Sequence, residues 1–135
     1  MSFSVYLQVA SLERSLAFYR DGLGLEVAWS DDVIAVLRGP GEHAATLVIR
    51  QVDGGARRGF GQAGVTRIGW QVTSPADLDS AEERLARHGA QYRRPDDTNG
   101  NRIATHDPDG LEVVVFLPPE PSLAEKPPPF VYWYR

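Results

Sequence analysis

A fixed cation and a carboxylate stand near the starts of two strand-like runs, Arg67 in TRIGWQV and Glu112 in LEVVVFL. Side by side, they permit general-base catalysis by the carboxylate, with the guanidinium stabilising developing negative charge. The arginine alone, with its planar fork of donors, can hold a carboxylate, a phosphate or a polarised carbonyl of a ligand. The structural alternative is an ion pair across a sheet, in which the arginine favours the ionised glutamate and leaves it a weak base.

The absence of cysteine and the small number of histidines limit the other kinds of catalytic and metal site that the chain can form. The chain has no cysteine, which excludes disulfides, thiolate catalysis and cysteine-ligated zinc. Its three histidines, His43, His88 and His106, fall in different predicted elements, and their spacing is not typical of a ligand pair. We interpret them as surface or turn residues. His106, next to Asp107, is the one that could lie at the mouth of a cavity.

Length and charge set the class of protein. The 135 residues fit one domain with a sizeable core, and 42% hydrophobic with 24% charged residues is typical of a soluble globular protein. Acidic and basic residues are interspersed with a net charge of −4, which argues against a nucleic-acid partner. No apolar run is long enough to span a bilayer and no signal-peptide pattern is present, so we expect a cytoplasmic protein without a membrane partner.

Alternation and caps predict the elements of the first half. Residues 4–9 alternate like a strand, with Ser4, Tyr6 and Gln8 on one face. Ser11 then suits the N-cap of a helix that ends at the glycines of DGLG. Three strand-like runs follow: LEVAWS, VIAVLR and TLVIRQV.

The second half repeats this order after a glycine-rich linker. A strand, a helix capped by Ser74 and closed by Gly89, two short strands, a DPDG turn and a last strand follow in turn. QVAS and QVTS occupy the same strand-to-cap junction in the two halves. We therefore predict an α+β domain of two βαβββ repeats, each sheet burying one face under its helix and the other faces curling around a shared cavity. The predicted divisions are repeat one at 3–52, the linker at 53–65, repeat two at 66–118 and a proline-rich aromatic tail at 119–135.

The duplication, with LERSLAFYRDGLGLEV after the first strand and DPDG before the last, resembles the vicinal oxygen chelate superfamily. The family includes glyoxalase I, bleomycin-resistance proteins, fosfomycin-resistance enzymes, methylmalonyl-CoA epimerase and extradiol dioxygenases. The resemblance covers roughly residues 3–118 and implies a glyoxalase-like curved mixed sheet around a cavity. It also implies a homodimer, since many members complete their cavities between two chains.

Metal-dependent members of that family take His, Gln and Glu ligands from four strands. Carried over by position, the resemblance places the ligands at Ser4, Val48, Arg67 and Val114. A shift of two residues in the fourth strand would replace Val48 by Thr46 or Arg50.

None of these side chains is a credible ligand. Valine donates nothing, a permanently charged arginine repels a metal ion, and a neutral serine is a poor donor. Glu112 is the only carboxylate near the four positions, and one carboxylate does not hold a divalent ion usefully. We predict that the family's metal site is absent and that no cofactor is bound.

A mixed polar and apolar cavity remains, of the kind that binds small organic molecules. Tyr6 suits either stacking on a ligand ring or filling the cavity mouth, and Gln8 and Gln71 either face each other or end their strands. Trp29 and Trp70 are interpreted as core or interface residues. The candidate ligand-binding residues are Ser4, Tyr6, Gln8, Val48, Arg50, Arg67, Gln71, Glu112, Val114 and Phe116.

The tail ends in five consecutive apolar or aromatic residues, 130–134, which we expect to dock on their own sheet or on a second subunit. The predicted function is a metal-free, small-molecule-binding homodimer resembling the bleomycin-resistance type. The alternatives are a metal-dependent lyase or dioxygenase of the same superfamily, or a metal-independent enzyme that uses Arg67 and Glu112.

Overall fold

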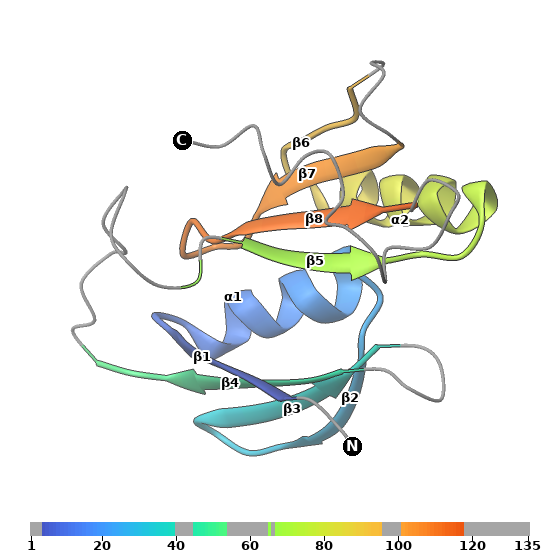
Figure 1. Cartoon of the computed structure of the whole chain (residues 1–135). Coiled ribbons are helices and arrows are strands. Elements are labelled where there is room, and N and C mark those ends of the chain that lie inside the picture. Colours follow the sequence, from blue (N-terminus) through green and yellow to red (C-terminus); the bar gives the residue numbers. More distant parts are fainter. Residues whose placement is uncertain (1–3, 40–44, 54–64, 66, 96–100, 118–135) are drawn as a thin grey trace.

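Two separate four-stranded sheets, one from each half of the sequence, make up the protein (Figure 1). A computed structural model describes residues 4–39, 45–53, 65, 67–95 and 101–117. His43, most of the predicted linker and the predicted tail lie outside these residues. The elements are β1 (Ser4–Val9), α1 (Leu12–Ala17), η1 (Phe18–Gly22), β2 (Glu26–Ser30), β3 (Ile34–Arg38), β4 (Thr46–Gln51), β5 (Arg67–Gln71), α2 (Pro75–His88), β6 (Tyr92–Arg93), β7 (Arg102–His106) and β8 (Glu112–Phe116).

Both sheets have the same topology. The first sheet runs β1-β4-β3-β2 and the second β5-β8-β7-β6. In each, the first strand pairs in parallel with the last, and the remaining pairs are antiparallel. The predicted α+β fold of two βαβββ repeats is therefore confirmed.

The helices begin and end where the sequence indicates. The Ser11 hydroxyl accepts a hydrogen bond from the amide of Arg14 at 3.3 Å, and Ser74 accepts one from Asp77 at 3.2 Å. Gly89 closes α2 at φ 83°, a left-handed conformation that favours glycine. Helix α1 continues into η1, one π-helical turn that the sequence pattern did not distinguish from an ordinary helix end.

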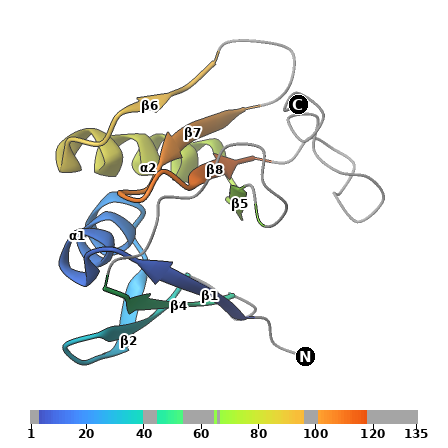
Figure 2. The same cartoon turned by 90° about the vertical axis from the view of Figure 1, so that its left-hand side faces the viewer.

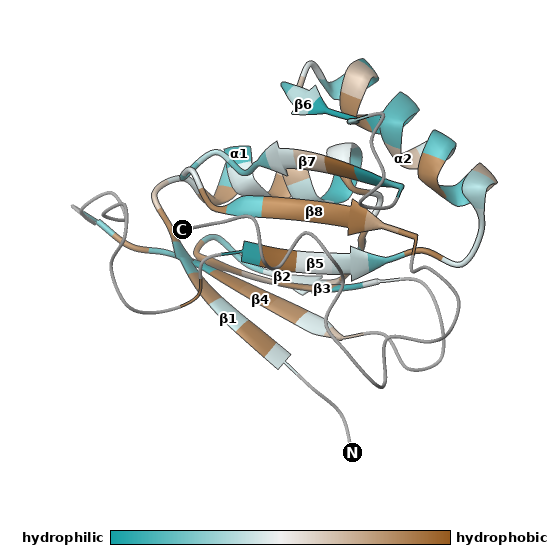
Figure 3. Ribbon diagram, turned by 45° about the horizontal axis from the view of Figure 1, so that its top comes forward, coloured by the Kyte–Doolittle hydropathy of each residue, from teal (hydrophilic) through white to brown (hydrophobic). Residues whose placement is uncertain are grey.

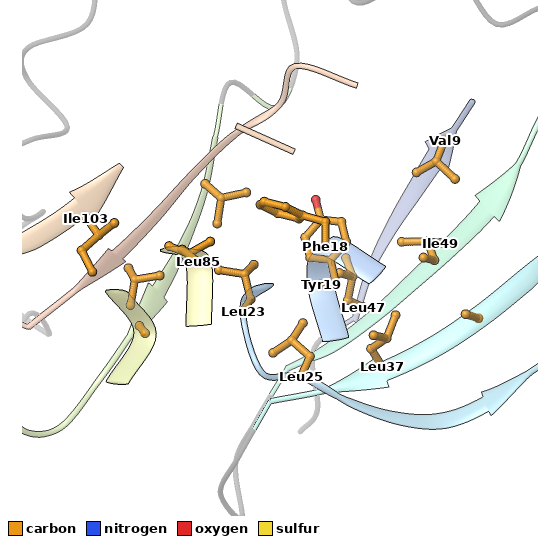
Figure 4. Close-up of a cluster of buried hydrophobic side chains, with 14 of the residues drawn as sticks. Val9, Phe18, Tyr19, Leu23, Leu25, Leu37, Leu47, Ile49, Leu85 and Ile103 are labelled. Atoms are coloured by element: carbon orange, nitrogen blue, oxygen red, sulfur yellow. The ribbon is translucent and has the colours of Figure 1, made fainter. Parts of the chain in front are cut away.

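One hydrophobic core is shared by both halves. Helices α1 and α2 lie between the two sheets (Figures 1 and 2), and the end of α1 packs through η1 against α2. Figure 4 shows core side chains of the first sheet on one side and of the second sheet on the other. Fully buried members include Tyr19, Leu37, Leu47, Ile49, Leu78, Leu85, Ile103 and Val113.

This layering turns the remaining face of each sheet outward. Helix α1 covers one face of β3 and β4, and α2 covers one face of β7 and β8. The faces that no helix covers point away from the helices and from one another (Figure 2). In the described part of a single chain, they therefore do not enclose a common cavity.

Strand β8 is the most buried strand of the second sheet. Each of its five residues is buried, and Figure 3 shows it brown along most of its length. Among the described helices, none has both the length and the apolar character needed to cross a bilayer.

Candidate functional site

All ten predicted ligand-binding residues lie on the sheet faces that no helix covers, which we call the open faces, five on each; Glu112, Val114 and Phe116 of the second sheet are nevertheless buried. Residues paired directly across neighbouring strands share a face, so the strand register assigns every position. The first open face comprises Ser4, Tyr6, Gln8, Glu26, Trp29, Ile34, Val36, Arg38, Thr46, Val48 and Arg50. The second open face comprises Arg67, Gly69, Gln71, Arg93, Arg102, Ala104, His106, Glu112, Val114 and Phe116.

The register also settles which residue of β4 matches the last strand. Tyr6 lies opposite Val48, and Gly69 lies opposite Val114. Because Tyr6 and Gly69 each precede the glutamine of the repeated junction by two residues, Val48 and Val114 occupy equivalent places. Within the internal repeat, Val48 rather than Thr46 or Arg50 is therefore the counterpart of Val114.

A divalent metal does not fit these positions. Within one chain, Ser4 and Val48 lie on the first open face and Arg67 and Val114 on the second. Their side-chain chemistry rules out a metal even where two chains bring these faces together. Two of the four side chains offer no donor atom, and the guanidinium of Arg67 is a fixed cation. Within the described residues, no three His, Cys, Asp or Glu side chains gather into a group able to hold a metal ion.

Arg67 and Glu112 form an ion pair across β5 and β8. Their Cα atoms are register partners, and Arg67 Nε lies 3.6 Å from Glu112 Oε2. The two side chains are only 13% and 9% exposed, so water screens the pair weakly. The contact is the ion pair across the sheet that the sequence analysis gave as the structural alternative to a ligand-binding arginine.

The centre of the second open face is apolar. Ala104, Val114 and Phe116 form a small buried cluster that is separate from the main core. A Cβ atom at Gly69 would lie 3.2 Å from the Phe116 ring, so the absence of a side chain there leaves space for this ring. Arg102, a register partner of Phe116, is buried on the same face and was missed as a candidate site residue.

The first open face is far more exposed, and it carries two large aromatic side chains. Tyr6 is 76% exposed, so it does not fill a cavity mouth within the chain. Trp29 is 54% exposed, which excludes the core interpretation and leaves the interface interpretation. Trp70, in contrast, packs against the main core as expected.

A β-bulge explains the position of Trp29. Val27 pairs with Leu37 on the core face, and simple alternation would place Trp29 on that face as well. The register shifts between these two residues, so Trp29 pairs with Val36 on the first open face. A bulge of one residue reverses the faces of a strand, and the alternation of EVAWS gave no sign of it.

The glutamines and histidines do not converge on one place within a single chain. Gln8 and Gln71 lie on different open faces of that chain. Gln51 accepts a hydrogen bond of 2.8 Å from the amide of Leu12 through its Oε1 atom. His106, at the end of β7, is exposed and lies opposite Glu112 on the second open face. His88 ends α2, with its ring 6.3 Å from that of Phe18.

Solved structures of the same fold are numerous. A glyoxalase/bleomycin resistance protein/dioxygenase domain from Frankia sp. EAN1pec is 28% identical, covering 84% of this chain and 94% of that one, with a TM-score of 0.68. A lactoylglutathione lyase from Agrobacterium tumefaciens is 19% identical over 87% of this chain and 92% of its own, with a TM-score of 0.62. A fosfomycin resistance protein from Mesorhizobium loti is 18% identical over 89% and 92%, with a TM-score of 0.64.

The sequence itself carries the family assignment. No curated protein matches the chain. The sequence profile of the glyoxalase/bleomycin resistance protein/dioxygenase superfamily matches residues 3–115, which covers most of both repeats. The chain therefore belongs to the glyoxalase/bleomycin resistance protein/dioxygenase superfamily.

Proposed function

We propose that this protein binds a small organic molecule without a metal ion, in the manner of the bleomycin-resistance branch of its superfamily. One observation carries the proposal: the four positions that correspond to the family's ligands hold Ser4, Val48, Arg67 and Val114. The Arg67–Glu112 ion pair supports it further, because the one carboxylate near these positions already has a cationic partner. A binding surface with aromatic and polar groups needs no metal to retain a ligand.

The proposal includes a homodimer, because the two open faces of one chain point away from one another. In the proposed dimer, the first open face of one chain lies opposite the second open face of its partner. Two equivalent cavities result, and each is lined by residues of both chains. Strands β1 and β5 each pair on one side only among the described strands, so their outer edges are available to meet in such an arrangement.

Cross-linking tests this geometry cleanly, because the chain has no cysteine. A Gln8→Cys, Gln71→Cys double variant treated with a bismaleimide is expected to give a covalent dimer. Each single variant should stay a single chain on a denaturing gel, since the proposed cavities do not bring two copies of the same position together. Equal cross-linking of the single variants, or none in the double variant, would contradict the proposed arrangement.

Metal content tests the central claim. Elemental analysis of the purified protein is expected to find no stoichiometric divalent metal. Addition of Ni²⁺, Mn²⁺, Zn²⁺ or Fe²⁺ to EDTA-treated protein should leave the melting temperature unchanged, because a ligand stabilises only the state that it binds. A clear metal-dependent rise in melting temperature would overturn the proposal.

A metal-independent enzyme is the second candidate, and the Arg67–Glu112 contact is the observation that favours it. Glu112 would act as a general base, with Arg67 stabilising negative charge on the substrate. The carboxylate of Glu112 already lies 3.6 Å from the guanidinium of Arg67, which counts against its use as a base toward a substrate. A turnover that is lost in both Glu112→Gln and Arg67→Ala would favour the enzyme.

A further inference from the structure

A band of apolar side chains crosses the first open face from edge to edge. Tyr6, Val48, Val36 and Trp29 are successive register partners on β1, β4, β3 and β2. The two valines in the middle are partly exposed, and the aromatic residues at the ends are 76% and 54% exposed. We call these four residues the aromatic band. Its apolar surface suits the face of a planar ring system.

An arginine flanks the aromatic band on each side. Arg50 follows Val48 by two residues on β4, and Arg38 follows Val36 by two residues on β3. Because β3 and β4 are antiparallel, the arginines lie on opposite sides of the band, about 13 Å apart along the strands. Both are exposed, and neither makes an ion pair with another described residue.

The two arginines differ in their surroundings. Glu26 is the register partner of Arg38, so a carboxylate lies close to that guanidinium. The register partners of Arg50 are Gln8 and Ile34, neither of which is charged. Arg50 is therefore the cation on this face whose neighbours across the strands leave its charge uncompensated.

Charge on the first open face is opposite in sign to that of the whole chain. The strand residues of this face include two arginines and one glutamate, a net charge of +1, whereas the complete sequence has a net charge of −4. A bound anion would compensate this positive charge, while a cationic ligand would add to it.

We propose that the ligand is a planar aromatic carboxylate, with its rings on the aromatic band and its carboxylate on Arg50. This inference rests on the proposed function, since it names the class of molecule that the same surface binds. The guanidinium offers two parallel N–H donors to the carboxylate, and the exposed side chains of Trp29 and Tyr6, at the two ends of the aromatic band, offer aromatic surface to the rings. The surface between the two arginines is long enough to accept a fused two-ring system.

The test compares naphthoate with its uncharged counterpart, naphthalenemethanol, by titration calorimetry on the whole chain at low salt. Naphthoate is expected to bind about tenfold more tightly, the preference that one charge-assisted contact typically gives. Raising the salt concentration to about 0.5 M should weaken naphthoate several-fold and leave the alcohol unchanged. Equal affinities, a tighter alcohol, or no binding of naphthoate would overturn the inference.

Substitutions test whether Arg50 is the residue that binds the carboxylate of naphthoate. Arg50→Gln should lower the affinity for naphthoate about tenfold and leave that for naphthalenemethanol unchanged. Arg87→Gln removes the same charge from an exposed position on α2 and should alter neither. Trp29→Ala should weaken both ligands. An unchanged naphthoate affinity in Arg50→Gln would contradict the assignment, as would conversion of a ligand-free dimer into a monomer by this substitution.

The two proposals fail in different ways. Binding of both probes with equal affinity would remove the preference for anions and leave a metal-free binding protein. A stoichiometric metal or a metal-dependent melting temperature would remove the proposed function, whatever the probes do.

Discussion

The hydroxyl of Tyr19 donates a hydrogen bond of 2.7 Å to the carboxylate of Asp107, and this bond joins the two repeats. Tyr19 lies in η1 of the first repeat and is fully buried, while Asp107 opens the DPDG turn of the second and is 6% exposed. The same carboxylate accepts hydrogen bonds from the amides of Asp109 and Leu111. The two stretches that carried the family resemblance are therefore in direct contact with each other.

Tyr19→Phe is expected to destabilise the protein by about 1.5–3 kcal/mol, the usual worth of a hydrogen bond to a charged group. The two backbone amides would still bond Asp107, so the chain should fold. Urea unfolding measures the loss. Tyr6→Phe is the matched control, because it removes a hydroxyl that is largely in water and should change stability by less than about 0.5 kcal/mol. Equal losses in both variants would contradict a special role for the Tyr19 contact.

Alkaline pH should reveal the same bond. Burial raises the pKa of Tyr19 far above its ordinary value of 10.0, and the charge of Asp107 raises it further. The neutral phenol is therefore favoured by folding, and its contribution is fully present below about pH 10. Above that pH the unfolded state loses a proton that the folded state keeps, so stability falls as pH rises.

Urea midpoints measured between about pH 8 and pH 11 test this sign. The parent protein should lose stability more steeply above about pH 10 than Tyr19→Phe, which has no phenol at this site. Parallel pH profiles for the two proteins would show that Tyr19 does not titrate in the way that its burial implies.

Local chemistry made most of the fold predictable from the sequence. Ser11, Ser74 and Gly89 act through hydrogen bonds and backbone conformations confined to a few residues, so their patterns could be read directly. The repeated junction then gave the order of the elements in both halves. The ion pair of Arg67 and Glu112 was also accessible, because β5 and β8 inherit the pairing of the repeat.

Two features were not predictable, and both depend on interactions beyond the local pattern. The bulge before Trp29 reverses the side of the sheet on which that residue lies, and nothing in the alternation of its strand encodes it. The outward orientation of the open faces depends on how the helices pack between the sheets. Hydrophobic periodicity identifies a buried face of each element but does not say which half of the chain covers it.

Gly24 and Gly89 offer a test that separates backbone strain from crowding. Both have positive φ, 78° and 83°, so alanine at either should cost roughly 1–2 kcal/mol for the left-handed conformation. A Cβ at Gly89 meets nothing within 4 Å, whereas one at Gly24 would lie 2.6 Å from Arg84 Nε. The side chain of Arg84 would have to move, and this movement would weaken its hydrogen bond to the carbonyl of Leu23.

Gly24→Ala should therefore destabilise the protein more than Gly89→Ala. Chemical denaturation of both variants measures the difference. An Arg84→Ala background should bring the two costs close together, because it removes the crowding and keeps the backbone strain. A difference that persists in that background would point to a cause other than Arg84.

Leu85→Ala tests whether the two repeats unfold as one unit. Leu85 on α2 is fully buried, and its methyl group lies 3.6 Å from where a Cβ of Gly22 would be, so it packs at the junction of α2 with η1. Removing it should cost about 2–5 kcal/mol, whereas Val33→Ala at a 45% exposed position should cost far less. Because the core contains residues of both sheets, the loss should be felt by the whole chain.

Variants that keep only Trp29 or only Trp70, the other tryptophans being changed to Phe, report on one sheet each by fluorescence. With Leu85→Ala, both reporters should shift to the same lower urea midpoint, as a single cooperative transition requires. A shift confined to the Trp70 reporter would mean that the halves are stable separately, in spite of the core that they share.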